Sequence, residues 1–281
     1  MDVNDYQAWI GRTDVSTDVA TAEPLRAWLA TLDYENLSVK EGAPLPLLAH
    51  LIFNKPLARL SDIGPDGHQQ RGEFLPPVAL PRRMWAGSRF EFRAPLRVGD
   101  RLSRRSEVIS IQPKTGASGA LVFVVVRHTI TSASGGEVAE DQTLVFRAAP
   151  SAGAPVRAAP GPAAQAPADF SRRVTPSEVM LFRYSALTFN GHRIHYDAPY
   201  AKEVEGYSGL IVHGPLLATL MIDLVARELP KAAIGSFEFT ARNAVALPAT
   251  ISVCGRREDK TVALWIEHAG AAAVAGKATL R

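Results

Sequence analysis

Residues 215–229 read Pro-Leu-Leu-Ala-Thr-Leu-Met-Ile-Asp-Leu-Val-Ala-Arg-Glu-Leu, and Pro230 follows them. Pro215 suits the first position of a helix, because the N–H that proline lacks would have no helical partner there. Pro230 ends the run. Apolar side chains fall on nearly every face of such a helix, so other elements should enclose it. The stretch therefore predicts a buried central helix.

Alternating apolar runs occur in two sets of three, one set in each part of the chain. They cover residues 106–111, 120–131, 142–147, 250–256, 261–268 and 272–280. Alternation of this kind indicates half-buried antiparallel strands. The triplet Phe-Glu-Phe precedes each set, at residues 90–92 and again at 237–239. We interpret the two sets as a tandem structural repeat; the alternative is chance similarity between two β-rich tails.

The first set of strands also has a candidate helix ahead of it, at residues 46–60, which Asn54 and Pro56 interrupt. A central helix wrapped by a curled antiparallel sheet describes a hot-dog fold. We therefore predict an α+β protein with a double hot dog, two such units in tandem. Residues 61–81 are rich in Gly, Pro and polar side chains and are expected to form an inserted loop.

A Pro/Ala-rich segment separates the two parts of the chain. Residues 149–169 hold five prolines among small side chains. Such a segment buries too little apolar surface to order itself, and its prolines favour an extended form. We divide the chain into a degenerate N-terminal hot-dog unit at 1–148, a linker at 149–169 and a catalytic unit at 170–281.

Composition excludes several classes of protein. The chain has 281 residues, with 31 Lys and Arg against 28 Asp and Glu, a net charge of +3. It shows no concentrated basic stripe, so nucleic acid is not an expected partner. The single cysteine, Cys254, allows no internal disulfide and fits a reducing compartment. The N-terminus is acidic and no apolar run is long enough to span a bilayer, so we expect a cytoplasmic protein without a membrane partner.

Three histidines lie close together in the second part of the chain: His192, His195 and His213. His195 titrates near neutrality and can move a proton in either direction. Asn190 offers one acceptor and two donors that could hold a water. The N–H of Gly214 would lie at the positive end of the predicted helix, where it could stabilise an oxyanion. These are the parts needed to add water to an α,β-unsaturated thioester, or to remove it.

The same cluster has other interpretations. His192, His195 and His213 could form a metal site, but no carboxylate accompanies them in a usual ligand motif, and we predict neither metal nor cofactor. A histidine before a helix can also serve only in packing or capping. A serine hydrolase is disfavoured, because the chain contains no Gly-x-Ser-x-Gly elbow.

Residues 184–197, with 208–215, resemble the MaoC-like enoyl-thioester hydratases and dehydratases. That family usually has an aspartate where this chain has Asn190. The sequence Phe-Asn-Gly-His-Arg-Ile-His-Tyr-Asp at 189–197 is similar to a narrower branch in which asparagine is expected. This branch contains the mesaconyl-C4-CoA and itaconyl-CoA hydratases and the type 2 hydroxyacyl-thioester dehydratases. The resemblance implies a hot-dog fold with one active site, in the second half.

The resemblance also implies roles for individual residues. His195 would be the general base, and the only one, because the amide of Asn190 cannot accept a proton near pH 7. Asn190 would position the water, and the N–H of Gly214 would stabilise the enolate oxygen. Substrate contacts are implied at Arg193, His213, Tyr184, Ser208 and Gly209.

The substrate implied by this branch is the CoA thioester of a C5 branched dicarboxylic acid. Mesaconyl-C4-CoA or itaconyl-CoA would be hydrated to citramalyl-CoA. A free carboxylate would need an Arg or Lys, and Arg183, Arg193 and Lys202 are the nearest in sequence. Alternatives are a 3-hydroxyacyl-[acyl-carrier-protein] dehydratase of fatty-acid synthesis, a hot-dog thioesterase and a non-catalytic acyl-thioester-binding module. We expect a homodimer.

Overall fold

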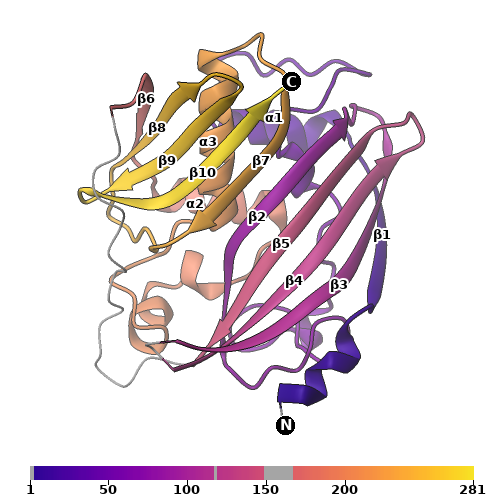
Figure 1. The fold of residues 1–281 in the computed structure, drawn as a ribbon, viewed down its shortest axis with the longest axis vertical. Helices are drawn as coiled ribbons and strands as arrows, with labels where there is room; N and C mark the ends of the chain where they lie inside the picture. Colours follow the sequence, from indigo (N-terminus) through magenta and orange to yellow (C-terminus); the bar gives the residue numbers. More distant parts are fainter. Residues whose placement is uncertain (1–2, 117–118, 149–166) are drawn as a thin grey trace.

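A computed structural model describes residues 3–116, 119–148 and 167–281 of the chain. Its strands form one antiparallel sheet of ten (Figure 1). The order across the sheet is β1 (Thr13–Val19), β3 (Arg101–Gly116), β4 (Gly119–Ser132), β5 (Glu137–Arg147), β2 (Arg82–Ala94), β7 (Ile234–Ala241), β10 (Ala271–Leu280), β9 (Thr261–His268), β8 (Ile251–Glu258) and β6 (Phe170–Val174).

The sheet repeats itself about its centre. Outward from the centre, the first half runs β2, β5, β4, β3, β1, and the second runs β7, β10, β9, β8, β6. The two Phe-Glu-Phe triplets meet where β2 pairs with β7, with Phe90 opposite Phe237. The rings of these two residues are stacked with their centroids 6.1 Å apart. The predicted double hot dog is therefore confirmed, and the repeated triplet lies at the junction of its halves.

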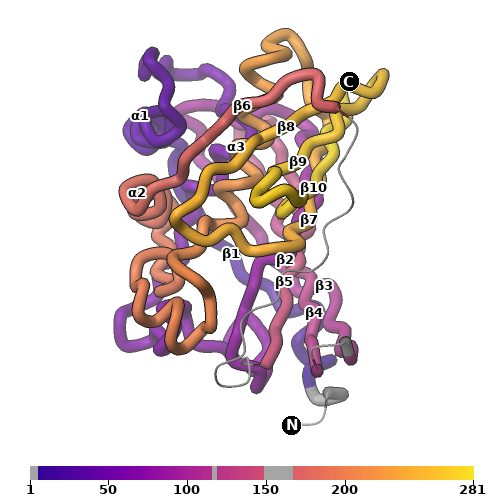
Figure 2. Tube along the Cα trace, turned by 90° about the vertical axis from the view of Figure 1, so that its left-hand side faces the viewer, coloured from indigo at the N-terminus to yellow at the C-terminus, as the bar shows by residue number. Residues whose placement is uncertain are grey.

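The central helix of the second half is α3 (Gly214–Glu228), as the apolar run predicts. Every residue from Leu216 to Val225 is buried. The helix packs against β8, β9 and β10 of its own half and against β2 of the other. Figure 2 shows the helices gathered on one side of the sheet. Both halves therefore contribute to the enclosure of α3.

The helix predicted at residues 46–60 is wrong. Only Ala49–Ile52 forms a single turn of 3-10 helix. Leu48 and Asn54 have left-handed backbone angles, with φ of 65° and 51°, on either side of that turn. An L-residue in this conformation does not continue a right-handed helix. The first half consequently lacks a counterpart to α3.

Two further helices were not predicted as elements. These are α1 (Ala22–Thr31), in the first half, and α2 (Glu178–Thr188), in the second. They pack against each other. The side chain of Ser177 caps α2 by accepting a hydrogen bond from the backbone N–H of Met180, at 3.3 Å.

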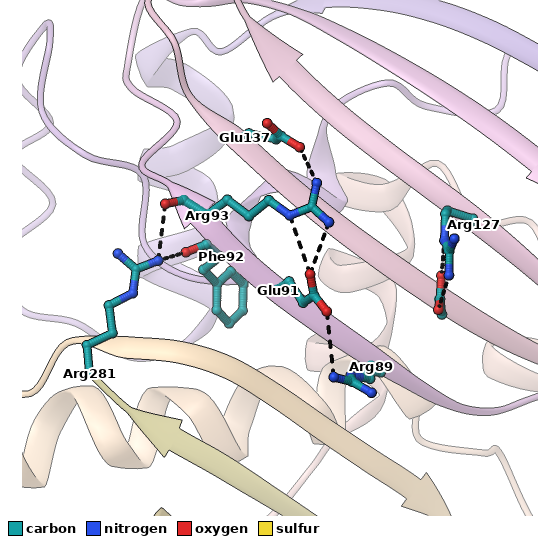
Figure 3. A network of polar contacts seen from close by, with 8 residues as sticks. Arg89, Glu91, Phe92, Arg93, Arg127, Glu137 and Arg281 are labelled. Carbon is teal, nitrogen blue, oxygen red and sulfur yellow. Dashed lines mark hydrogen bonds and ion pairs between the residues drawn. The ribbon is translucent and has the colours of Figure 1, made fainter. Parts of the chain in front are cut away.

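The C-terminal residue also links the halves, on the outer side of the sheet (Figure 3). Arg281 donates hydrogen bonds from its guanidinium to the backbone carbonyls of Phe92 and Arg93 on β2. Arg93 in turn pairs with Glu91 and Glu137. Ion pairs this exposed contribute little to stability, so the strand pairing and the core hold the two halves together.

Residues 149–166 of the predicted linker lie outside the described residues. Among the helices of the described part, none is long and apolar enough to cross a membrane.

Candidate active site

His195 lies in a 3-10 turn, Arg193–His195, beyond the end of α2. Its Nδ1 donates a hydrogen bond to the backbone carbonyl of Ile211 at 2.7 Å, since a carbonyl can only accept. Burial lowers the pKa of His195 to about 4. The ring is therefore neutral at pH 7, with its proton on Nδ1 and an unshared electron pair on Nε2. His195 also lines a cavity. A neutral imidazole with an unshared electron pair on Nε2 is in the protonation state that a general base needs.

A row of four imidazole rings passes through this site. The centroids of His68 and His192 are 4.1 Å apart, those of His192 and His195 are 5.5 Å apart, and those of His195 and His213 are 3.6 Å apart. The last two rings are nearly parallel, at 17°. Ring nitrogens point along the plane of their ring, so stacked rings do not converge on one ion. The alternative metal site of His192, His195 and His213 is therefore not formed.

Gly214 is the first residue of α3 and lines the same cavity. The first N–H groups of a helix have no partner within the helix, and they lie at its positive end. A Cβ built on Gly214 would lie 3.6 Å from the backbone oxygen of Trp85, on β2 of the other half. The helix N-terminus thus faces the cavity where the two halves meet.

Asn190 also lines the cavity. Its Oδ1 accepts a hydrogen bond from the backbone N–H of His192 at 3.0 Å. This bond fixes the amide and uses one of the two lone pairs of the oxygen. Phe189 enables the turn that carries Asn190 away from α2, with a left-handed φ of 53°. The side chains of Asn190 and His195 therefore reach one cavity from a single short loop.

The five predicted substrate contacts are absent from the described residues that line the cavity. His213 is fully buried behind His195, where its Nε2 lies 2.8 Å from the hydroxyl of Ser185. Tyr184 is buried in the core, at 1% exposure. Ser208 is exposed outside the cavity, and a Cβ on Gly209 would lie 2.1 Å from the backbone oxygen of Leu247. His213, Tyr184 and Gly209 are therefore packed within the protein, whereas Ser208 lies at its surface.

Arg193 is likewise committed to the protein itself. Its guanidinium pairs with Asp197 through two nitrogens, at 3.0 and 2.7 Å, and donates to the backbone oxygen of Pro65. It also lies over the ring of Tyr200, 4.1 Å from the centroid. This arginine holds the active-site loop in place and is not directed at a substrate.

The inserted loop contributes residues that the sequence pattern missed. His68 lines the cavity, and its Nδ1 lies 2.9 Å from Oδ2 of Asp66. The backbone oxygen of Asp66 accepts from the N–H of Arg193 at 2.9 Å, so the tip of the insertion is docked on the active-site loop. Burial, together with the nearby charge of Arg83, lowers the pKa of His68 to about 4.

Asp66, His68 and His192 are also the described residues that bring three ligand-type atoms within 4.8 Å of one another. The aspartate is already hydrogen bonded to His68. The positive charge of Arg83 acts on both histidines and lowers their pKa, as it would oppose a cation. The three residues fit a hydrogen-bonded carboxylate and imidazole group beside Arg83 better than a metal centre.

The absence of a side chain at Gly67 allows the inserted loop to dock on the active-site loop. A Cβ at this position would lie 1.8 Å from the backbone oxygen of Gly191, and φ is +88°. We expect Gly67→Ala to push the insertion off the active-site loop and to lower kcat/KM severalfold while the fold persists. Gly135→Ala is the control, because Gly135 has the same φ of +88° with nothing within 4 Å. Equal losses of activity in the two variants would contradict a docking role.

The cavity has a volume of about 990 Å³ and is lined by both halves. The second half supplies His195, Asn190 and Gly214, and the first half supplies side chains of β2 to β5 and residues 50 and 51. The first half lacks a full central helix, and this cavity extends to the face of its sheet. A volume of this size falls in the range of small-molecule and cofactor sites.

The double hot dog and the histidine-lined cavity define the class of the MaoC-like hydratases and dehydratases. Comparisons with known proteins agree. The sequence model of hydroxyacyl-thioester dehydratase type 2 matches residues 48–247. Mesaconyl-C(4)-CoA hydratase of Chloroflexus aurantiacus is 43% identical over 241 residues, which cover 85% of this chain and 84% of that protein.

Solved structures share the fold at low sequence identity. A MaoC-like dehydratase from Phytophthora capsici superposes with a TM-score of 0.74 and 16% identity, over 100% of this chain and 98% of that one. A Mycobacterium tuberculosis protein with a double hotdog fold superposes with a TM-score of 0.57 and 15% identity, over 97% and 96%. The chain belongs to the hydroxyacyl-thioester dehydratase type 2 family, and it is a hydro-lyase.

Proposed function

We propose that the protein hydrates the CoA thioester of a C5 branched unsaturated dicarboxylic acid. The observation that carries the proposal is the 43% identity to a mesaconyl-C(4)-CoA hydratase over most of both chains. It is supported by the neutral His195 and the helix N-terminus at Gly214, which line one cavity. Mesaconyl-C4-CoA is the first candidate substrate, with itaconyl-CoA as the second, and citramalyl-CoA is the product.

The mechanism assigns one step to each group. Nε2 of His195 takes a proton from water as the water oxygen attacks the β-carbon. The N–H of Gly214 donates to the thioester oxygen while negative charge develops there. His195 then returns its proton to the α-carbon, so that water is added and no other reactant is consumed. Asn190 cannot take the proton, and its fixed amide orients the water.

A panel of substrates tests this proposal. The purified protein is expected to remove the enone absorbance of mesaconyl-C4-CoA or itaconyl-CoA and to form citramalyl-CoA. Crotonyl-CoA turnover with a preference for carrier-protein thioesters would instead favour a dehydratase of fatty-acid synthesis. Release of free thiol would indicate a thioesterase, and binding without turnover a non-catalytic module. The homodimer and the cytoplasmic location stay predictions.

A further inference from the structure

A band of polar side chains lines the cavity on the first-half sheet. We call it the polar band: Arg104 on β3, His128 on β4, Glu140 and Gln142 on β5, and His50. Strand register places these residues side by side, because His128 is directly opposite Glu140 and Arg104 is two residues from the partner of His128. Nothing in the hydration chemistry at His195 uses them.

Two members of the polar band have buried nitrogens without a partner. Nε2 of His50 and Nε of Arg104 make no hydrogen bond with any described residue. His50 is only 7% exposed. The other members are satisfied in part, since His128 Nδ1 lies 2.8 Å from the hydroxyl of Ser106 and Glu140 accepts from Ser88 at 2.6 Å. Protein atoms cover these two nitrogens, but both side chains line the cavity, so a ligand would meet the other polar atoms of His50 and Arg104.

The charge of the polar band suits an anion. Arg104 is its permanent cation, and burial keeps the two histidines neutral by lowering their pKa, that of His50 to about 3 and that of His128 to about 4. Burial raises the pKa of Glu140 to about 7, so that carboxyl can be protonated and donate a hydrogen bond. An aliphatic acyl chain would offer the charge of Arg104 no partner.

We propose that the polar band binds the free carboxylate of a dicarboxylyl-CoA substrate, with Arg104 as the principal donor and His50 as the second. This inference rests on the proposed function and supplies the recognition that it requires. One cavity holds both Arg104 and His195, so a single acyl group is bound by the first half and hydrated by the second.

Other arginines fit this role less well. Arg193 is paired with Asp197 and does not line the cavity. Arg83 lines it, but the ionised carboxylate of Asp66 offsets its charge, whereas Glu140, which acts on Arg104, has its pKa raised to about 7 by burial. Arg242 is exposed, where it could meet only a part of the substrate outside the enclosed region. Arg104 lines the cavity on the face of the first-half sheet, away from the active-site loop.

The test compares ligands that differ by one carboxylate. Succinyl-CoA and butyryl-CoA are saturated, and they carry a carboxylate and a methyl group at the same position. The dissociation constant of each is measured directly by isothermal titration calorimetry, in the wild type and in Arg104→Met. We expect Arg104→Met to weaken succinyl-CoA about 100-fold, as for loss of one partner of a buried charge pair, and to leave butyryl-CoA nearly unchanged. The kcat/KM for mesaconyl-C4-CoA should fall by the same factor.

Three further variants sharpen the result. Arg105→Met is the matched control, because Arg105 is exposed and pairs with Glu107. Arg104→Lys keeps the charge without the guanidinium fork and should give an intermediate loss, and it replaces Arg104→Met if that variant does not fold. Arg83→Met tests the rival cation.

Several results would overturn the inference. These are equal weakening of succinyl-CoA and butyryl-CoA in Arg104→Met, no weakening of either, or selective weakening in Arg83→Met alone. A wild type that binds succinyl-CoA no better than butyryl-CoA would do the same. If the wild type shows the succinyl-CoA preference but does not hydrate mesaconyl-C4-CoA or itaconyl-CoA, the proposed function fails while the carboxylate site stands.

Discussion

Replacing His195 with alanine should lower kcat for hydration by more than about 100-fold, which is the usual contribution of a positioned acid–base group. The reason is that the amide of Asn190 cannot take over the proton transfer. The measurement is the initial rate of loss of enone absorbance at saturating substrate. We expect the melting temperature to show that the variant is folded.

His195→Gln is the sharper variant, because its side-chain amide can still donate a hydrogen bond toward Ile211 but cannot accept a proton. It should be as inactive as the alanine variant. The matched control is His268→Gln, which alters a histidine on β9 outside the cavity. Near-normal kcat in either His195 variant would remove His195 from the mechanism.

The protein should also be unusually sensitive to acid. Four histidines are buried, His50, His192, His195 and His213, and burial lowers the pKa of each. In the unfolded chain each would titrate near 6.5. Below that pH the unfolded state therefore binds more protons than the folded state, and the free energy of unfolding falls as pH falls.

The expected decrease in the free energy of unfolding at acid pH is large. Well below pH 6.5, each such histidine lowers the free energy of unfolding by about 1.4 kcal/mol per pH unit. His68 and His128, whose pKa is likewise lowered to about 4, add to these four, so the six give roughly 8 kcal/mol per unit. Glu140 opposes them by one proton, since its folded pKa of about 7 is above its unfolded value. Against a total stability of about 5–15 kcal/mol, acid unfolding should be centred near pH 5.

Urea unfolding at several pH values, followed by tryptophan fluorescence, measures this dependence. His50→Gln should reduce the slope of stability against pH by about one proton. A free energy of unfolding that stays constant between pH 7.5 and pH 5.5 would contradict the burial of neutral histidines.

Local sequence patterns predict the fold well for those helices and strands whose own apolar periodicity identifies them. The enclosed helix α3, the strands β3, β4, β5, β8, β9 and β10, and the repeated triplet follow directly from apolar periodicity. The helix at 46–60 failed because left-handed residues at Leu48 and Asn54 override its apolar content. The short edge strands β1 and β6 have mixed polar sequences and carry no alternating signal.

The residues of the candidate site likewise fall into those that the sequence predicts and those that it does not. Asn190 and His195 come from one short motif and Gly214 from the start of the apolar helix, so local patterns in the sequence predict all three. Asp66 and His68 join them only because two loops dock through Gly67 and Gly191, which no local pattern shows. A local signal did exist for Arg193, since Asp197 follows it at the spacing of a helical ion pair.

The central claim is that this cavity adds water across the double bond of a dicarboxylyl-CoA. The most direct test incubates the wild type with mesaconyl-C4-CoA in deuterated water labelled with heavy oxygen, and reads the product by mass spectrometry. We predict citramalyl-CoA with one heavy oxygen in its hydroxyl group, one deuterium on the α-carbon and the thioester intact. Free CoA with heavy oxygen in a carboxylate, or unchanged substrate, would contradict the account.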